Sequence, residues 1–227
     1  MAAHKGYGQF CPVAKAAEIV AERWTPLVLR ELICGSHRFN ELRLGVPLMS
    51  SALLSQRLKE LEDAGVIERR TGAGNTAEYH LSEAGQELQP IIEALGVWGA
   101  RWTRSRLTIQ DYDPSLLMWD IRRNIDVAHM PATRSVIEFN LRGAEPSVRR
   151  WWLVVECGEV DLCLKDPGYE VNLHLSAELR AMVEVWMGRE SMSEAARTGQ
   201  LKFEGPPTLV ASFQKSLKLS IFARAAR

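Results

Sequence analysis

The sequence predicts an α+β protein with two domains, and three observations lead to this prediction. Residues 1–106 show helical spacing of apolar side chains, interrupted once by a hairpin pattern. Residues 107–227 show strand-like segments followed by helices, and a polar stretch at 104–115 connects the two patterns. A chain of 227 residues with a hydrophobic fraction of 46% is long enough to bury a core in each domain.

The N-terminal part begins with four predicted helices, over residues 12–24, 25–34, 39–44 and 50–64. Pro12 and Pro26 stand at the first helical position of the first two, where the missing N–H costs no hydrogen bond. Gly35 and Gly65 follow the second and the fourth helix, as helix-ending glycines do. The fourth helix is expected to bury the stripe Leu54, Leu58 and Leu61.

Two strand-like runs follow, over residues 66–70 and 77–81, around a turn rich in glycine. Ser82 then caps a long helix that carries Trp98 and Trp102. Helices, a hairpin wing and a further helix, in this order, make a winged helix-turn-helix. The N-terminal domain is therefore expected to bind double-stranded DNA.

The outward face of the fourth helix favours contact with DNA, because its small hydroxyl and amide side chains can reach base edges in a major groove. Its acidic residues cluster at the C-terminal end, away from the end that points at bases. Taken alone, such a face is more often an ordinary helix surface, so the order of elements is what favours DNA. The expected DNA-contacting residues are Arg38, Asn40, Ser50, Ser51, Ser55, Gln56, Arg57, Lys59, Arg69 and Arg70.

The composition restricts the other functional classes. Lys+Arg and Asp+Glu both number 28, which counts mildly against nucleic acid, so the positive charge must be local. Four cysteines without a Cys-x-x-Cys spacing predict no metal site, and no cofactor is expected. None of the five histidines falls in a metal or triad spacing, so we expect no enzyme. The chain shows no signal peptide and no membrane span, which predicts a cytoplasmic protein.

Several blocks of residues 8–103 together resemble the HxlR family of winged-helix regulators. They are Cys11-Pro12-Val13, Arg38-Phe39-Asn40-Glu41-Leu42, Ser50 to Leu61, and Glu78-Tyr79-His80-Leu81-Ser82. The resemblance implies a dimeric regulator, in most cases a repressor, that binds a palindromic operator. It also implies that the first and last helices of the domain build the dimer interface. The wing departs from the family pattern, because 71–76 is short and glycine-rich where a longer, proline-containing tip is usual.

The long helix carries more apolar surface than one small domain is expected to bury, which favours dimerisation over the alternative that this surface covers the domain's own core. The expected interface residues are Val13, Leu88, Ile91, Ile92, Leu95, Trp98 and Trp102. Cys11 allows two interpretations. Some relatives sense oxidants or electrophiles at this position, but a buried, unreactive thiol at the dimer seam is favoured.

The C-terminal part is predicted to form an antiparallel meander with one buried face, backed by helices. Asp113-Pro114 opens a helix, and Ser176 is expected to cap another. Gly158-Glu159 is expected to join two strands as a hairpin. The expected strands are residues 136–141, 151–157, 160–165 and 171–175, followed by a helix at 193–197, a last strand at 201–203 and a helix from 207.

Residues 112–222 resemble the sterol-carrier-protein fold, chiefly through Trp186-Met187-Gly188 and the segment Gly199 to Gly205. The resemblance implies an apolar tunnel between sheet and helices that could hold a lipid or another hydrophobic small molecule. The ordinary alternative is that these side chains fill the core. The candidates to line a tunnel are Met118, Trp119, Met182, Trp186 and Phe213.

The sequence thus leaves three functions open. One is a DNA-binding regulator whose operator affinity responds to a hydrophobic small molecule in the C-terminal domain. Another is a regulator with a ligand-free C-terminal assembly domain and thiol-based sensing at Cys11. The last is a lipid-binding protein.

Overall fold

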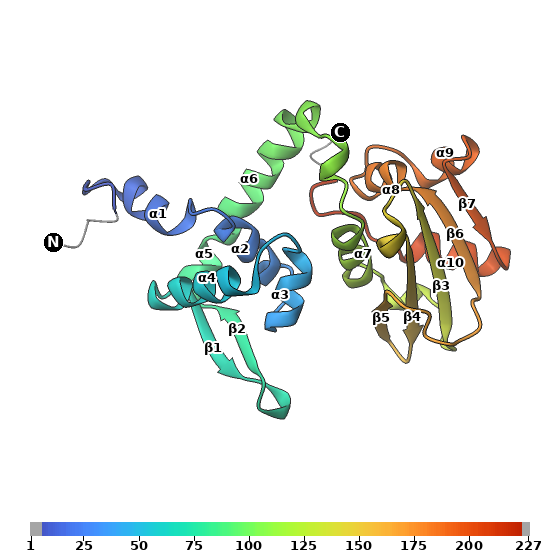
Figure 1. Ribbon diagram of the computed structural model, residues 1–227, viewed down its shortest axis with the longest axis horizontal. Coiled ribbons are helices and arrows are strands. Elements are labelled where there is room, and N and C mark those ends of the chain that lie inside the picture. Colours follow the sequence, from blue (N-terminus) through green and yellow to red (C-terminus); the bar gives the residue numbers. More distant parts are fainter. Residues whose placement is uncertain (1–5, 224–227) are drawn as a thin grey trace. The chain divides into compact units, whose positions relative to one another are not determined.

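The computed structural model describes residues 6–223, except for the side chain of Arg104. Contacts between Cα atoms divide the chain into two compact units, Met1–Gly96 and Val97–Arg227 (Figure 1). This boundary falls inside helix α6 (Gln89–Trp102), whereas the sequence-based boundary follows that helix at residue 106.

The N-terminal unit consists of helices around a small core, with a two-stranded hairpin on one side (Figure 1). The second helix begins at the predicted residue, and the fourth begins one residue later than predicted. Both hairpin strands are present, the first shifted by one residue. The elements are α1 (Pro12–Val20), α2 (Thr25–Ile33), α3 (Phe39–Gly45), α4 (Ser51–Asp63), β1 (Ile67–Thr71), β2 (Ala77–Leu81), α5 (Glu83–Glu87) and the first part of α6. Its core is built mainly from Val28, Leu29, Leu32, Leu42, Leu54, Leu58, Leu61, Ile67 and Ile92.

The first helix is shorter than predicted, because it ends at Val20 and not at residue 24. Trp24 has a left-handed backbone, with φ of 76°, and stands at the N-cap of α2. Its carbonyl accepts the first N–H groups of that helix, from Leu27 and Val28, both at 3.0 Å. A residue in this conformation cannot continue α1, which explains the difference.

The predicted single helix after Ser82 is in fact two helices, α5 and α6, which meet at Leu88. Pro90 is the reason, because proline has no N–H to donate and its ring collides with the carbonyl four residues earlier. At this junction the backbone hydrogen bonds join residues three apart instead of four apart. Leu88 donates to Gly85 at 3.1 Å, and Ile91 donates to Leu88 at 3.0 Å.

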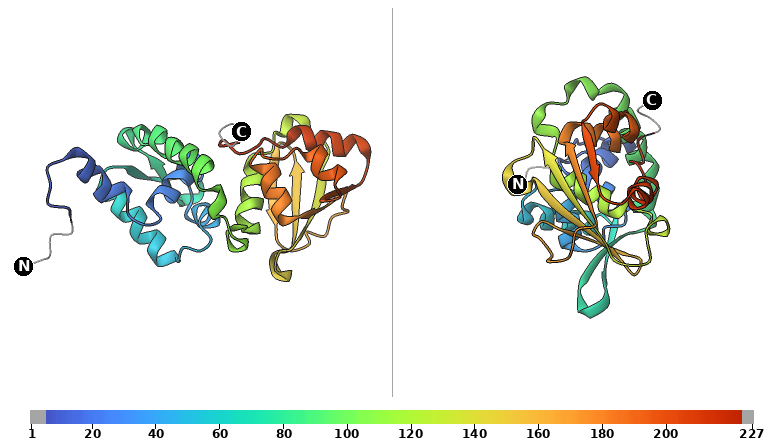
Figure 2. Two further views of the ribbon diagram at one scale, coloured as in Figure 1. Left: turned by 90° about the horizontal axis from the view of Figure 1, so that it is seen from above. Right: turned by 90° about the vertical axis from the view of Figure 1, so that its right-hand side faces the viewer.

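The C-terminal unit is a five-stranded sheet with helices, as the α+β class predicts. Its strands lie side by side and twist across the sheet in the order β5-β4-β3-β6-β7 (Figure 2). The elements are α7 (Pro114–Arg123), β3 (Ser135–Arg142), β4 (Arg150–Glu156), β5 (Glu159–Cys163), β6 (Leu173–Glu178), α8 (Leu179–Trp186), α9 (Met192–Arg197), β7 (Leu201–Glu204) and α10 (Pro207–Ser216).

The sheet is mixed and is not the predicted antiparallel meander, because β6 pairs with β3 in parallel, with Ile137 opposite Leu173. The hairpin between β4 and β5 places β5 at an edge. From that edge the chain returns across the sheet to the free side of β3. Asn172 fixes the arrival point, because its Oδ1 accepts the N–H of Val136 at 2.8 Å and its N–H donates to the Val136 carbonyl at 2.9 Å.

Ser176 was predicted to cap a helix, and this prediction is wrong. It lies inside β6, where its hydroxyl accepts Nη1 of Arg142 at 2.7 Å. Glu178, which pairs with Arg142 at the end of the parallel ladder, takes the N-cap position of α8. The strand continues past Ser176 because β3 and β7 pair with it on both sides.

The two faces of this sheet carry different side chains. Strand β4 alternates, so Leu153 and Val155 face the main core while Trp152 and Val154 face the other side. A small apolar cluster of Val136, Trp152 and Val154 covers part of that second face, against which Val171 packs.

Candidate nucleic-acid interface

Helix α4 presents a polar outward face to solvent within its own unit. Ser50 caps its start, with Oγ accepting the N–H of Leu53 at 3.3 Å. The inward stripe predicted for this helix is buried. The exposed side chains are Ser51, Ala52, Ser55, Gln56 and Lys59. The sequence prediction for this face therefore agrees with the exposure of each of these residues.

A buried polar network behind α4 fixes the turn between α2 and α3. The carboxylate of Glu31 is fully buried and accepts Nη2 of Arg30 at 2.7 Å and the hydroxyl of Ser36 at 3.2 Å. Arg30 also donates to the carbonyl of Gly45 at 2.8 Å, at the end of α3. Because a buried carboxylate is tolerated only when it is paired and hydrogen-bonded, the three groups hold α3 in one position.

Gly45 is required by this network. A Cβ atom at that position would lie 1.9 Å from Cδ of Glu31. The glycine thus allows the end of α3 to approach the buried carboxylate, and α3 in turn leads directly into the turn before α4.

Two polar residues at the start of α3, Arg38 and Asn40, are exposed. Arg38 stands at the N-cap, and Glu41 accepts the backbone N–H groups of His37 and Arg38, both at 3.0 Å. The side chain of Arg38 is half exposed, and its Nε lies 3.3 Å from Oε1 of Glu78. Asn40 is exposed one position inside the helix.

The predicted wing residues differ in how they are held. Both arginines of β1 are exposed. Arg70 donates to Glu68 at 3.0 Å, whereas no ion pair is found for Arg69 within residues 6–223. The wing therefore offers one cation that is free of a carboxylate.

On α4, two of the residues predicted to contact DNA are already bonded within the protein. The guanidinium of Arg57 is mostly buried and forms ion pairs with Glu60 and, at 3.0 Å, with Glu22. Nε2 of Gln56 donates to Oε1 of Glu60 at 2.9 Å. Arg57 thus joins α4 to the segment after α1, while Gln56 remains exposed and can exchange its partner.

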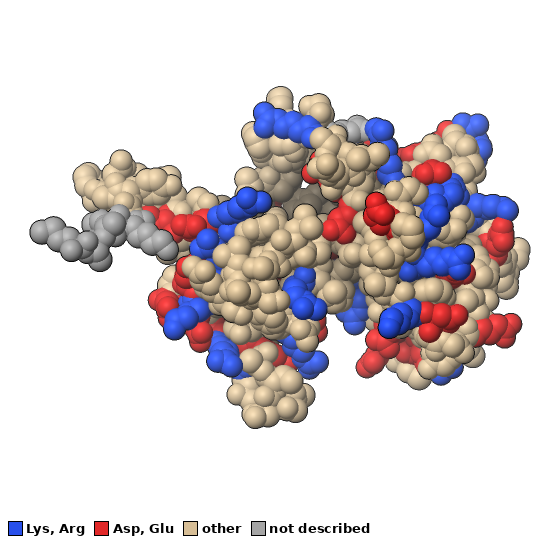
Figure 3. Space-filling view, in the orientation of Figure 1, with Lys and Arg blue, Asp and Glu red and all other residues tan. Residues whose placement is uncertain are grey.

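The charged side chains of this unit are of mixed sign. On the face shown in Figure 3, Lys and Arg lie in small groups with Asp and Glu among them. On α4 the exposed acidic residues Glu62 and Asp63 stand at the C-terminal end, while Lys59 is nearer the middle. The acidic residues Glu62 and Asp63 thus lie away from the N-terminal half of α4.

Sequence reasoning missed a group of side chains on one face of the wing. Glu78 and His80 share a face of β2, and the ring of His80 stacks on that of His37 with centroids 4.3 Å apart. The alternation of β2 placed Glu78 and His80 on one side, but nothing in the sequence indicated that residues 37 and 38 lie beside it.

The predicted dimer residues separate into two groups. Leu88 and Ile92 pack against the core of their own unit. The other five are exposed by more than half: Val13 at 75%, Ile91 at 56%, Leu95 at 52%, Trp98 at 56% and Trp102 at 70%. Helix α1 has no buried residue at all. Cys11 is partly exposed at the N-cap of α1 and makes no side-chain capping bond.

The predicted pocket residues of the C-terminal unit are all less than a tenth exposed. Four of these residues belong to the main core, namely Met118, Met182, Trp186 and Phe213. The fifth is Trp119, and the guanidinium of Arg122 lies 5.1 Å from its ring centroid.

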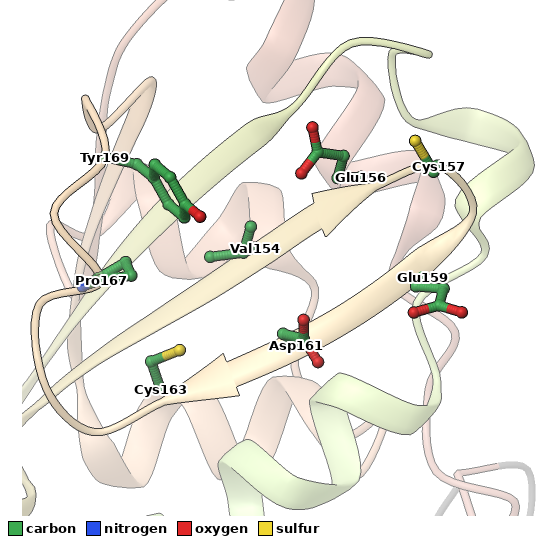
Figure 4. A pocket seen from close by; sticks show the side chains of 8 residues that line it. All are labelled: Val154, Glu156, Cys157, Glu159, Asp161, Cys163, Pro167 and Tyr169. Carbon is green, nitrogen blue, oxygen red and sulfur yellow. The ribbon is translucent and has the colours of Figure 1, made fainter.

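A pocket of about 390 Å³ opens on the other face of the sheet (Figure 4). Its lining residues are Val154, Glu156, Cys157, Glu159, Asp161, Cys163, Pro167 and Tyr169.

Comparison with known proteins assigns both parts of the chain. The model of the HxlR-like helix-turn-helix family matches residues 19–106. The uncharacterized HTH-type transcriptional regulator YvaP of Bacillus subtilis (strain 168) is 37% identical over 97 residues, which cover 41% of this chain and 90% of that protein. The chain belongs to the HxlR-like helix-turn-helix family. The model of the SCP-2 sterol transfer family matches residues 126–218.

A second curated relative agrees with this HxlR-type assignment, and a solved structure is also similar to the chain. The HTH-type transcriptional regulator YodB of the same organism is 32% identical over 91 residues, which cover 39% of this chain and 81% of that protein. The redox regulator HypR in its reduced form is 28% identical, with a TM-score of 0.39, over 42% of this chain and 97% of that chain. The family model and the two curated relatives show that the chain is a transcriptional regulator of HxlR type, and the second family model gives it an SCP-2-like domain.

The two family matches follow the observed elements. The HxlR match extends from the end of α1 through α6, and the SCP-2 match includes all five strands of the sheet and α10. Within residues 6–223, no set of three His, Cys, Asp or Glu side chains is arranged to hold a metal ion. In that same range, no helix has both the length and the apolar character of a membrane span.

Proposed function

We propose that this HxlR-type regulator represses transcription by binding a palindromic operator as a homodimer. The observation that carries the proposal is the exposed N-terminal half of α4, which has Arg38 at the start of the preceding helix and the wing after it. In helix-turn-helix docking, the N-terminal residues of the second helix contact base edges and the neighbouring segments hold the backbone.

The contacts divide by chemistry. Ser55 and Gln56 are suited to base edges, and an amide can bind adenine through two hydrogen bonds. To do so, Gln56 exchanges its bond to Glu60 for the base. Arg38, Arg69 and Arg70 are suited to phosphates, which fix the position of the domain without reading sequence.

Dimerisation is supported by unpartnered apolar surface on two helices. Val13 on α1 and Ile91, Leu95, Trp98 and Trp102 on α6 are exposed in the single chain. Large apolar side chains that stay exposed to water mark an interaction surface. Leu88 and Ile92 belong to the core and are not part of the interface that we propose.

The C-terminal domain is proposed to bind a hydrophobic small molecule that changes operator affinity. The SCP-2 match supports this, together with a core that contains flexible methionines at Met118 and Met182. Because the candidate residues are buried, a ligand must displace or separate them. Thermal unfolding with a panel of fatty acids, sterols and aromatic compounds tests this, since a ligand of the folded state raises the melting temperature. If no compound does so, the domain is an assembly module.

Selection of bound duplexes from a random pool tests DNA recognition by the full chain. The expected result is a palindrome with half-sites about one helical turn, or a multiple of it, apart. Placing the selected site over a reporter promoter should then lower transcription. Enrichment of no sequence, or of a single half-site without its repeat, contradicts the proposal.

A further inference from the structure

A polar cluster connects the start of α3 with one face of the wing. Arg38 forms an isolated antiparallel bridge with Glu78, and the N–H of Tyr79 donates to the carbonyl of His37 at 2.8 Å. Residues 37 and 38 thus run beside β2 as a short third strand. The backbone of Arg38 is therefore fixed to the wing as well as to α3.

The side chain of Arg38 is held through its Nε atom. This atom lies 3.3 Å from Oε1 of Glu78, while no bond to the terminal amino groups of Arg38 is found in residues 6–223. The side chain is half exposed. A guanidinium bonded in this way keeps its terminal N–H groups available, and these groups match the geometry of a phosphate.

Glu78 is itself held on its other side. Its Oε2 atom lies 3.3 Å from Nε2 of His80, and the ring of His80 stacks on the ring of His37. The ring of His37 is held in turn, because its Nδ1 atom lies 3.1 Å from the carbonyl oxygen of Tyr79. The hydrogen bond with His80, followed by that with Arg38, lowers the pKa of Glu78 below its ordinary value. A Cβ atom at Gly72 would lie 2.3 Å from the carboxylate of Glu78, so the glycine leaves the space that this carboxylate occupies.

The remaining charged groups of this region are engaged elsewhere. Across the hairpin, Arg70 stands opposite Glu78 and Glu68 opposite His80. Arg70 and Glu68 bond to each other at 3.0 Å. Glu41 is occupied by backbone N–H groups at the start of α3. Glu78 is thus the carboxylate that orients Arg38.

We propose that Glu78 is a positioning residue, which orients the guanidinium of Arg38 so that its terminal amino groups bind a DNA phosphate. The inference rests on the proposed DNA-binding function. Glu78 makes no contact with DNA and acts only through Arg38, because preorganising a long side chain removes part of the entropy that binding would otherwise cost.

Two variants separate positioning from charge. Glu78→Gln and Glu78→Ala both remove the negative charge, which repels phosphate, but only glutamine keeps an oxygen that can accept Nε–H of Arg38. We expect Glu78→Gln to bind the selected operator at least as tightly as the wild type. Glu78→Ala should bind about threefold to fivefold more weakly than Glu78→Gln, as for the loss of one hydrogen bond. The loss should be equal for operator and unrelated duplexes, because phosphates carry no sequence.

The control is the same pair of variants in an Arg38→Ala background, measured by fluorescence anisotropy with the full chain. There the two variants should bind alike, since the partner of Glu78 is gone. Glu78→Thr, which is too short to reach Arg38 but suits a strand, repeats the test if the alanine variant unfolds. Equal binding of Glu78→Ala and Glu78→Gln, or a difference that persists without Arg38, overturns the inference alone. A wild type that binds no duplex overturns the proposed function and the inference with it.

Discussion

Individual side chains at the proposed interface divide into those that read sequence and those that hold phosphate. Gln56→Ala should weaken binding to the selected operator by about 1–3 kcal/mol and leave unrelated duplexes unaffected, because a bidentate base contact is lost.

Arg38→Ala should weaken all duplexes alike and reduce the slope of affinity against salt by about one counterion. Titrations at several salt concentrations on both kinds of DNA check this. A sequence-selective loss in Arg38→Ala would contradict the assignment.

The buried carboxylate of Glu31 makes Gly45 sensitive to substitution. Gly45→Ala places a methyl group 1.9 Å from Cδ of a side chain that Arg30 and Ser36 hold in place. We expect a loss of about 1–3 kcal/mol in the free energy of unfolding, as for an overpacked core. Urea denaturation measures it. Gly99→Ala is the control, because there the nearest heavy atom is 3.9 Å away and alanine suits a helix better than glycine.

Cys11 stands at the N-cap of α1 without a side-chain capping bond. Cys11→Ser is therefore expected to keep operator affinity within twofold of the wild type, roughly the scatter of an uninvolved surface substitution. Anisotropy with and without a mild oxidant is the measurement. If oxidant releases the wild type from DNA and leaves the serine variant bound, Cys11 is a sensor.

Among the elements, α1 and the exposed side of α6 form the dimer interface that we propose. Leu95→Glu puts a charge where the proposed partner's apolar surface would bury it, and burying an unpaired charge is costly. We expect a monomer by sedimentation velocity and weaker operator binding, with unchanged helix content. Ile109→Glu is the matched control, since Ile109 is 88% exposed and lies outside both helices. A Leu95→Glu dimer would place the interface elsewhere.

Elements whose bounds depend on neighbouring residues could be predicted from the sequence. Pairings between segments far apart in the sequence could not. Asp113 accepts the N–H of Ser115 at 2.7 Å and starts α7 next to Pro114, as neighbouring residues alone suggested. The partner of β6 is β3, more than thirty positions earlier, and no residue of β6 encodes that choice. The same limit applies to the site. The face of α4 follows from its own periodicity, whereas the contact of Glu78 with Arg38 joins segments that only the fold brings together.

The point at which the chain is cut should decide whether an isolated N-terminal fragment dimerises and binds the operator. A fragment of residues 1–106 keeps α6 complete, while one of residues 1–96 lacks Trp98 and Trp102. We expect the longer fragment to dimerise and to bind the operator, and the shorter one to be monomeric, because it loses the largest exposed apolar side chains of α6. Sedimentation and anisotropy compare them. Equal dimerisation of both would exclude the end of α6 from the interface.

The contact between Gly45 and Glu31 has a consequence for genetics. A screen for cells that have lost repression collects every change that removes the regulator, whether or not it touches the promoter. Substitutions at these two positions should therefore appear among the hits beside those at Arg38 and Gln56. Immunoblots would separate the classes, since the first would show depleted protein through turnover of misfolded chains and the second normal amounts.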